Sequence, residues 1–299
     1  MKLIVNNNVK KRNEMRKVSA ILTSDWHLRE TVPVCRTDDF WKVQVNKVNF
    51  IHALQRKYDC PVIHAGDLFH YWKPSPYLLS MSINNLPNQF VTVYGQHDLP
   101  QHNLNLKEKS GIYVLESANR LTVLDGCSWG QTPKTASLEI GGRKILVWHN
   151  FTYVGKDPWP GITSPKAYLL LEKYKQFDLI VTGDNHQSFT FNNQNGNLLV
   201  NPGSLTRQNA DQIDFQPKVY LWYADDNSVE TVDVPIEKNV ISREHIEVIQ
   251  NRNDRIDAFV EKLQTDFSAT VSFEKNIDLF FQTNRVRKDV KEIIYTNME

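Results

Sequence analysis

Six short apolar stretches each end in a cluster of polar residues, and this repeated layout constrains the fold more than any other feature. The stretches cover residues 18–23, 60–65, 90–94, 144–148, 177–182 and 198–200. Runs of this length, rich in β-branched and aromatic residues, are typical of buried β-strands. Polar groups at the carboxyl ends of strands in an α/β sheet gather in one crevice. We therefore expect the six clusters to meet at a single site.

Helical patterns lie between some of these strands. Residues 39–58 place apolar side chains near one face at helical spacing. Ser75-Pro76 is typical of an N-cap followed by the first helical residue, and predicts a helix that ends near Pro87. Ser164-Pro165 repeats this signal before residues 167–177. These patterns predict helices that alternate with the strands.

Later in the chain the connections become short and predict hairpins. Gly141-Gly142 and Asn195-Gly196 each separate two strand-like runs, and residues 225–228 form a polar turn between two more. Alternating strands and helices followed by hairpins predict an α/β fold. We expect a two-sheet mixed β-sandwich flanked by helices, with a small C-terminal helical unit.

The length of 299 residues suggests one large domain with a smaller appendage. We expect an N-terminal arm over residues 1–17, a main domain over 18–238 and a small C-terminal unit over 239–299. The arm carries a basic cluster that we interpret as solvated: Lys10, Lys11, Arg12, Arg16 and Lys17. In the last unit, residues 254–264 and 286–295 have the pattern of amphipathic helices.

Composition excludes several classes of protein. The formal net charge is only +1, so any nucleic-acid binding must rest on a local patch rather than a global field. The three cysteines are far apart, which argues against a disulfide framework or a cysteine zinc site. No apolar run is long enough for a signal peptide or a membrane span. We expect a soluble, intracellular, cytoplasmic protein without membrane contact.

The polar clusters have the composition of a metal centre. The strand-end residues are Asp25, His27, Asp67, Gln96, His97, His149, Asp184 and His186. Carboxylates, imidazoles and an amide suit two divalent cations about 3.5–4 Å apart with one bridging carboxylate. Mixed imidazole and carboxylate ligands favour manganese, iron or zinc over calcium. Such a pair of cations activates water and polarises a phosphoryl group.

The order of these motifs resembles the calcineurin-like metallophosphoesterases. Asp-x-His, Gly-Asp, Gly-Gln-His-Asp, a lone His after a strand and Gly-Asp-x-His follow one another between residues 25 and 186. Gly-Asp-Leu-Phe-His after Asp-x-His-Leu looks more particularly like the Mre11/SbcD nuclease branch. Residues 75–87 and the sequence Asn-Pro-Gly-Ser at 201–204 are similar to that branch as well.

The resemblance implies a role for each site residue. The first cation would take Asp25, His27, Asp67 and His186, with Asp67 bridging, and the second would take Asp67, Gln96, His149 and Asp184. His97 would not bind metal but would face the scissile phosphate, where it would stabilise the transition state or protonate the leaving oxygen. His70 matches a family histidine near the same phosphate, with a satisfied loop histidine as the alternative. Ser204 and Arg207 would contact phosphate, although Arg207 could equally be a solvated surface residue.

Two positions depart from the family pattern, and both belong to the second cation. The family carries Asn where this chain has Gln96, and His where it has Asp184. Glutamine offers the same carbonyl oxygen on a longer side chain, and Asp184 replaces a neutral nitrogen by an anionic oxygen. We expect harder ions here, manganese first, with magnesium, iron and zinc as alternatives. A weak second cation, or a single cation with little catalysis, are the other outcomes.

The resemblance implies a DNA nuclease, exonuclease or endonuclease, that cleaves a phosphodiester by in-line attack of a hydroxide between the two cations. Because related folds act on many phosphoesters, a phosphodiesterase for RNA or a small nucleotide is the second hypothesis. A DNA-end-binding scaffold with weakened catalysis is the third. The resemblance also implies a Rad50/SbcC-like ATPase partner, which the C-terminal helices would contact, and a homodimer. Those helices could instead pack on the core of this protein.

Overall fold

The computed structural model describes residues 16–135, 137–266 and 273–297, and the chain divides into one unit that ends at Ser242 and a second that begins at Arg243. Most of the predicted N-terminal arm, including Lys10, Lys11 and Arg12, lies outside the described residues. Arg16 is described, and its guanidinium lies 3.9 Å from the centre of the Tyr223 ring. The three segments taken from the sequence, with boundaries at 17/18 and 238/239, stay a prediction.

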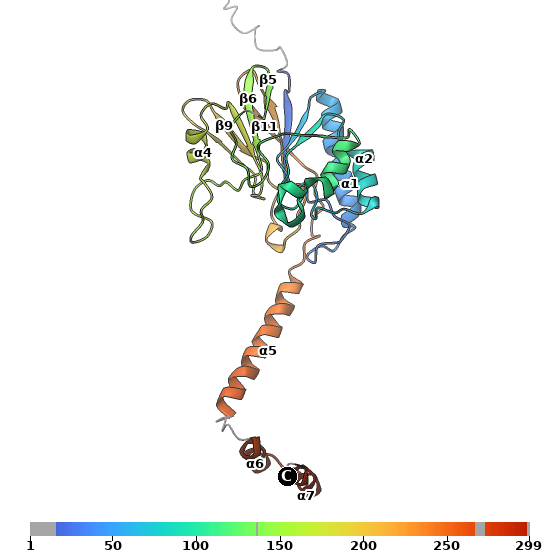
Figure 1. The fold of residues 1–299 in the computed structure, drawn as a ribbon, viewed down its shortest axis with the longest axis vertical. Helices are drawn as coiled ribbons and strands as arrows, with labels where there is room; N and C mark the ends of the chain where they lie inside the picture. The colour runs from blue at the N-terminus through green and yellow to red at the C-terminus, as the bar shows by residue number, and fades with distance from the viewer. Residues whose placement is uncertain (1–15, 136, 267–272, 298–299) are drawn as a thin grey trace, which may run out of the picture. The chain divides into compact units, whose positions relative to one another are not determined.

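The first unit contains two sheets (Figure 1). The first sheet has the strand order β11-β10-β1-β2-β3-β4. Its strands in chain order are β1 Ala20–Thr23, β2 Val62–His64, β3 Phe90–Thr92, β4 Thr122–Val123, β10 Lys218–Tyr223 and β11 Ser228–Asp233. Strands β1 to β4 are parallel, whereas β10 pairs antiparallel with β1 and with β11. The carboxyl ends of β1, β2 and β3 therefore meet at one edge.

The second sheet has the order β5-β6-β7-β9-β8. Its strands are β5 Leu138–Ile140, β6 Arg143–Trp148, β7 Leu179–Thr182, β8 Phe189–Asn192 and β9 Leu198–Asn201. The central strands β6, β7 and β9 are parallel, and β5 and β8 are antiparallel edge strands. The predicted hairpins at Gly141-Gly142 and Asn195-Gly196 connect β5 to β6 and β8 to β9, and residues 225–228 lie at the β10–β11 connection, so all three hairpins are confirmed.

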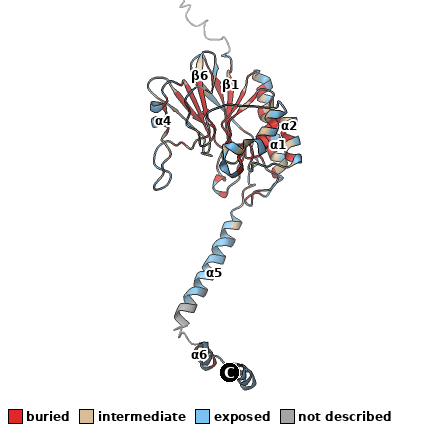
Figure 2. Cartoon of the chain, in the orientation of Figure 1, coloured by how far each residue is buried: buried red, intermediate tan, exposed pale blue. Residues whose placement is uncertain are grey.

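Side chains that alternate along the first sheet divide the interior into two cores. In β1, Ile21 belongs to a core shared with the helices, whereas Ala20 and Leu22 belong to a core shared with the second sheet. This division follows from the two-residue period of a strand. Figure 2 shows the strands as the most buried part of the unit, and Figure 1 shows α1 and α2 on one side and α4 on the other. The predicted fold class, two mixed sheets flanked by helices, is confirmed.

The helices of the first unit begin largely where the sequence predicts. Helix α1 spans Phe40–Tyr58, and the side chain of Asp39 caps it by accepting from the Lys42 N–H. Helix α2 spans Pro76–Asn85, with Ser75 as its N-cap. Helix α3, Gly111–Ser117, was not predicted. Three short 3₁₀ helices cover Pro100–His102, Leu104–Lys109 and Ala210–Gln212.

Helix α4 begins later than the sequence predicts. It spans Ala167–Lys173, with Lys166 rather than Ser164 in the N-cap position and no side-chain cap. The Ala167 N–H donates to the Tyr153 carbonyl at 2.9 Å, and Tyr153 and Lys166 form a parallel β-bridge. Because this bridge holds Lys166 in an extended conformation, the helix cannot start at Pro165. The prediction of a Ser164 cap is therefore wrong.

The second unit contains helices α5 Glu244–Asp266, α6 Phe273–Thr283 and α7 Lys288–Thr296. Both segments predicted to be amphipathic helices lie in α5 and α7, whereas α6 was not predicted. Helices α6 and α7 contact each other through the rings of Phe281 and Tyr295, whose centres are 5.5 Å apart. None of the helices in the described ranges is long and apolar enough to cross a membrane. All three cysteines are free, as predicted.

Candidate metal centre

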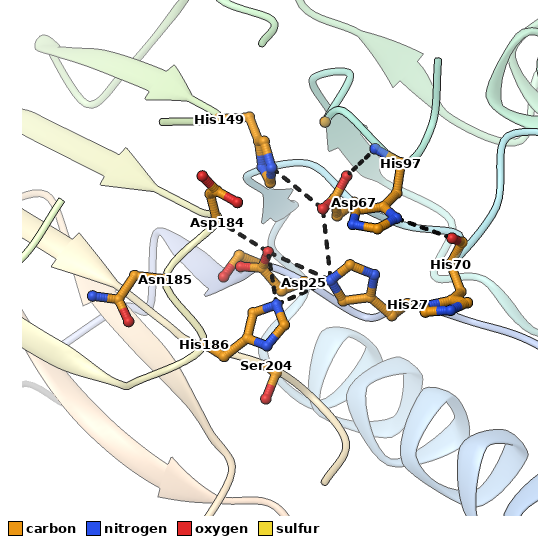
Figure 3. Close-up of polar contacts among 12 residues, drawn as sticks. Asp25, His27, Asp67, His70, His97, His149, Asp184, Asn185, His186 and Ser204 are labelled. Atoms are coloured by element: carbon orange, nitrogen blue, oxygen red, sulfur yellow. Dashed lines mark hydrogen bonds and ion pairs between the residues drawn. The ribbon is translucent and has the colours of Figure 1, made fainter. Parts of the chain in front are cut away.

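Strand ends from both sheets bring the predicted ligands together (Figure 3). The first sheet supplies the residues after β1 and β2, and the second supplies those after β6 and β7. These residues are Asp25, His27, Asp67, His149, Asp184 and His186. Four of them have left-handed backbones, Asp25, His27, Asp67 and Asp184, with φ of 50°, 44°, 56° and 71°. Since non-glycine residues rarely adopt this conformation, it indicates side chains that the fold aims at a functional site.

The first predicted ligand group is compact. The Nε2 atoms of His27 and His186 are 3.1 Å apart, and both lie about 4 Å from Oδ1 of Asp25, at 3.9 and 4.0 Å. Oδ2 of Asp67 lies 3.6 Å from His27 Nε2. Asp25, His27 and His186 offer ligand atoms that all lie within 4.8 Å of one another, a spacing that suits one cation. The structure therefore brings all four residues of the first group together.

Asp67 also belongs to the second group. Its Oδ2 atom lies 3.4 Å from Nε2 of His149, and Asp25, Asp67 and His149 again offer ligand atoms within 4.8 Å of one another. The His149 ring is oriented by a 2.6 Å contact between its Nδ1 atom and the Ala65 carbonyl. That contact requires a proton on Nδ1, so Nε2 is the atom left for a cation. A carboxylate between two sets of imidazoles is the arrangement expected of a bridging ligand.

The two unusual residues of the second group contact each other. The Gln96 side-chain amide donates from Nε2 to Oδ1 of Asp184 at 2.5 Å. The opposite oxygen of the same amide, Oε1, is buried and has no hydrogen-bond partner among the described residues. Gln96 therefore presents a carbonyl oxygen while its nitrogen holds Asp184 in place.

Unpaired buried atoms test whether these residues fit a metal. Among the described residues, the buried polar atoms without a hydrogen-bond partner include Asp25 Oδ2, Asp67 Oδ2, His149 Nε2 and Gln96 Oε1. Each such atom costs on the order of 1–3 kcal/mol if it stays unpaired. Four of them on residues predicted to bind metal indicate that a cation would satisfy them together. The residues present fit divalent metal ions.

The pKa values of Asp25, Asp67 and His149 depend on their burial and on one another's charges. Burial raises the pKa of the Asp25 carboxyl to about 8, although the nearby His149 charge acts in the opposite direction. Burial also opposes ionisation of Asp67, but the charge of His149, 3.4 Å away, outweighs it and holds the Asp67 pKa below its usual range. In return, the Asp67 carboxylate overcomes burial and raises the pKa of His149 to about 10. Binding a cation to His149 must therefore release its proton.

Burial holds three further imidazoles of the site, those of His27, His70 and His186, in the neutral form. Burial lowers the pKa of His27 and of His186, and it lowers the pKa of His70 to about 4 with help from the neighbouring Arg29 charge. Neutral imidazoles keep a lone pair for a cation or for a proton. His27 and His186 are therefore already in the protonation state that metal binding requires.

His97 lies where a catalytic imidazole is needed. Its backbone N–H donates to Asp67 Oδ1 at 2.9 Å, and its Nδ1 atom lies 3.1 Å from the His70 carbonyl. The second contact places the proton on Nδ1 and leaves the lone pair of Nε2 available. The rings of His70 and His97 stack with centres 5.6 Å apart. Both predicted catalytic histidines therefore lie together beside the ligand groups.

Asp98 was not predicted as a site residue, although it ends the same sequence motif. Its carboxylate accepts from the backbone N–H groups of Asp67 at 2.8 Å, Phe69 at 3.0 Å and Gly95 at 3.0 Å. This arrangement joins the loop after β2 to the loop after β3 and so positions Asp67. The fixed position of an aspartate directly after Gln96 and His97 is the signal that could have identified it.

Gly95 is required for space rather than for its backbone conformation. The sequence suggests that it permits a tight turn, but it is not among the glycines with positive φ. A Cβ atom at this position would lie 2.1 Å from Oδ1 of Asp67. The close approach of this backbone to Asp67 therefore excludes any side chain.

Asn201 positions the loop that carries Asp184 and His186. Its side-chain amide donates to the carbonyls of Asn185 and Gln187, each at 2.7 Å. Its oxygen accepts from the Thr182 hydroxyl at 3.0 Å. The Asn-Pro-Gly-Ser motif therefore contributes a side chain that holds the loop after β7.

A small cavity of about 140 Å³ opens beside the histidines. Its lining residues are His27, Arg29, His70, His97, His186, Ser204, Thr206, Gln208, Asn209 and Gln212. Ser204 is in this set, so its predicted substrate contact is geometrically available. Arg207 is not, and its guanidinium donates instead to the carbonyls of Ile213 and Glu237. Arg207 is 4% exposed, so the structure places it neither in the cavity nor in solvent, whereas Arg29 lines the cavity.

The comparison with protein families agrees with this geometry. Residues 20–219 match the family described as the calcineurin-like phosphoesterase superfamily domain. The chain therefore belongs to this family, and a metal-dependent phosphoesterase is the class that its fold and site define. No curated protein matches the chain significantly.

Solved structures with a similar fold share little sequence with this chain. Vacuolar protein sorting 29 from Cryptosporidium parvum is 17% identical, with a TM-score of 0.34, over 73% of this chain and 97% of that one. A single mutant of Vps29 from Entamoeba histolytica is 16% identical, with a TM-score of 0.35, over 73% and 99%. A conserved uncharacterized protein and predicted phosphoesterase from Streptococcus pneumoniae is 16% identical, with a TM-score of 0.32, over 72% and 96%. The assignment to the Mre11/SbcD branch stays a prediction.

Proposed function

We propose that this protein is a phosphodiesterase that uses two divalent cations, manganese first, to hydrolyse DNA. The observation that carries the proposal is the shared carboxylate of Asp67, which lies 3.6 Å from His27 Nε2 and 3.4 Å from His149 Nε2. Its other oxygen accepts from the backbone N–H of His97. Asp67 therefore contacts both predicted ligand groups and also the backbone of His97, whose imidazole would transfer the substrate proton.

Each residue then has a defined task. When bound, the cations would polarise the phosphoryl oxygens and lower the pKa of a coordinated water. Asp25, Asp67, His27 and His186 would hold the first cation, and Asp67, His149, Gln96 and Asp184 the second. His97 would hold or donate a proton through Nε2, at the oxygen of the leaving group. His70 keeps the His97 ring in place through its carbonyl and the stacked rings.

The size of the cavity favours a polymer over a small nucleotide. Pockets that enclose a whole small molecule are typically about 300–1,000 Å³. The cavity beside His97, at about 140 Å³, suits a phosphate group with the rest of the substrate outside. Tyr71 follows His70 directly and is 58% exposed, which offers a ring on which a base could stack. These features support a nucleic-acid strand, and the motif resemblance favours DNA.

Digestion of end-labelled single- and double-stranded DNA in Mn²⁺ tests the proposal. Asp67→Asn removes the bridging charge at nearly constant volume, and Asp233→Asn on the exposed end of β11 is the matched control. We expect digestion by the wild type and the control and none by Asp67→Asn. Faster turnover of RNA or of a cyclic nucleotide would instead support the second hypothesis. Absence of any phosphoester hydrolysis by folded wild-type protein would refute the proposal.

The number of cations bound per chain distinguishes the metal-dependent enzyme from the DNA-end-binding scaffold. The Gln96 amide already donates to Oδ1 of Asp184, which leaves that oxygen less available to a metal. Weak binding of the second cation is therefore the specific alternative that the geometry offers. We expect two Mn²⁺ ions per chain after dialysis at micromolar Mn²⁺, measured by mass spectrometry of the metal. One ion per chain together with DNA-end binding and no digestion would favour a scaffold.

We also propose that the second unit contacts a Rad50/SbcC-like ATPase. Helix α5 exposes apolar side chains that include Val248 at 60%, Ile249 at 56% and Ile256 at 47%. An amphipathic helix with such a face commonly enters an apolar groove of a partner. The double variant Ile249→Glu and Ile256→Glu should no longer co-elute with an ATPase of this class and should digest DNA at the wild-type rate. Equal co-elution of variant and wild type would argue against this contact.

A further inference from the structure

Arg29 stands two residues after His27 and lines the cavity beside the predicted metal ligands. Its backbone is fixed by Gln44 of α1, which is fully buried. The Arg29 N–H donates to Gln44 Oε1 at 2.9 Å, and the Gln44 amide donates back to the Arg29 carbonyl at 2.8 Å. The position of Arg29 is therefore set by its main chain and does not depend on its guanidinium.

The guanidinium itself is only partly satisfied. Nε donates to the Thr31 hydroxyl at 2.8 Å, and Nη1 makes a long contact of 3.4 Å with Gln208 Oε1. An arginine side chain has five N–H donors, so several remain available. Within the described ranges no carboxylate lies within ion-pair distance of Arg29. A half-buried cation without a counter-ion is energetically unfavourable unless an anion binds beside it.

Other arginines of the first unit show what a purely structural role looks like here. Arg36 and Arg143 each form an ion pair with an aspartate, Asp38 and Asp178. The Arg120 guanidinium donates to the Ile83 and Leu86 carbonyls. Among the residues that the structure describes, the Arg29 guanidinium has neither an aspartate nor such carbonyl partners, and both atoms that it contacts are neutral side-chain oxygens. Its surroundings therefore resemble a binding position more than a structural one.

The other residues that line the cavity indicate which anion would fit. His97, His186 and Ser204 line it together with Arg29, so a group in the cavity touches the catalytic imidazole and a predicted metal ligand at once. Guanidinium groups bind phosphate oxygens through two parallel N–H donors. We propose that Arg29 binds a non-bridging oxygen of the substrate phosphate that occupies this cavity. This inference rests on the proposed phosphodiesterase function and names a substrate-binding residue for it.

A structural role through Gln208 is the alternative that an experiment must separate. The Gln208 amide donates to the His27 carbonyl at 3.1 Å and to the Thr206 hydroxyl at 2.7 Å. If Arg29 acted only by holding Gln208, its loss would disturb His27 and hence Mn²⁺ binding. If Arg29 binds phosphate, its loss would leave Mn²⁺ binding unchanged.

The test titrates inorganic phosphate into Mn²⁺-loaded full-length protein by calorimetry and measures kinetics with bis(4-nitrophenyl) phosphate. Arg29→Gln removes the charge, Arg29→Lys keeps it without the paired donors, and Arg56→Gln on the exposed last turn of α1 is the charge-matched control. For Arg29→Gln we expect about ten- to hundredfold weaker phosphate binding and a raised KM, as for loss of a charged hydrogen bond. Arg29→Lys should fall between, and Arg56→Gln should equal wild type.

Three results would overturn the inference. They are unchanged phosphate affinity in Arg29→Gln, a parallel loss of Mn²⁺ binding in that variant, and no phosphate binding by wild type. Wild-type protein that binds phosphate but hydrolyses no phosphoester would refute the proposed function alone. In that case the phosphate titration of the variants still decides the role of Arg29.

Discussion

Shortening Gln96 by one methylene should selectively weaken the second cation. The Gln96 amide donates to Asp184 Oδ1 at 2.5 Å while its Oε1 atom has no partner in the described part of the chain. Gln96→Asn withdraws the amide by roughly one C–C bond, about 1.5 Å. The contact with Asp184 would then lengthen to about 4 Å, beyond hydrogen-bond distance. A hydrogen bond to a charged group contributes about 1.5–3 kcal/mol, which corresponds to about ten- to hundredfold in affinity.

Calorimetric titration of Mn²⁺ into metal-free protein measures this effect directly. We expect two binding steps in wild type, with the weaker step reduced by that factor in Gln96→Asn and the stronger step unchanged. Gln89→Asn, at an exposed position before β3, is the control. Identical isotherms for wild type and Gln96→Asn would refute the argument that this amide supports the second cation.

The double variant with Asn at 96 and His at 184 restores the residues of the superfamily pattern. If the two positions form one coupled unit, its affinity should exceed that expected from the sum of the single changes. An imidazole in place of the Asp184 carboxylate should also shift the preference from Mn²⁺ towards Zn²⁺. Strict additivity with unchanged metal preference would show that the contact between Gln96 and Asp184 has no role in ligation.

Three further changes test the frame of the site. Gly95→Ala places a methyl group 2.1 Å from Asp67 Oδ1 and should abolish Mn²⁺ binding, measured by calorimetry; retained binding would contradict the spatial argument. Asp98→Asn should lower the free energy of unfolding by about 2–3 kcal/mol, measured with urea, because its carboxylate accepts several buried N–H groups. Burial lowers the pKa of His64 to about 3. Because the unfolded state takes up a proton near pH 6.5 and the folded state does not, this residue should reduce stability by about 2 kcal/mol between pH 6.5 and 5. His64→Leu should show a smaller loss than wild type in urea unfolding with chelator; an equal loss would exclude His64 as the cause.

The sequence was most informative where chemistry and topology coincide. Asp25 and Asp67 follow neighbouring parallel strands of one sheet, so the rule that strand ends meet at one edge was enough to bring them together. His149 follows a strand of the other sheet, and the packing of the two sheets brings it to the same site. The hairpin glycines and the Ser75 cap were equally predictable, because each depends on only a few neighbouring residues. The Ser164 cap failed because a contact from Tyr153, which is distant in sequence, fixes the backbone before α4.

Residues whose role depends on long-range packing could not be found in this way. Arg29 and Arg207 look alike in the sequence, each following a site motif within a few residues. Only the fold shows that Arg207 donates to the Ile213 and Glu237 carbonyls whereas Arg29 reaches the cavity.

The ligands come from both sheets of the sandwich, and this has a consequence for how the protein tolerates change. Asp25 and Asp67 belong to the first sheet, whereas His149 and His186 belong to the second. Bound cations would therefore link the two sheets, and their binding free energy would add to the free energy of unfolding of the sandwich. Conversely, a slight slide of one layer over the other, caused by a volume change at Trp222 in the shared core, would alter every ligand spacing at once. Substitution of apolar residues in the shared core can thus change the ligand spacing, and with it the metal affinity, without any contact with a metal.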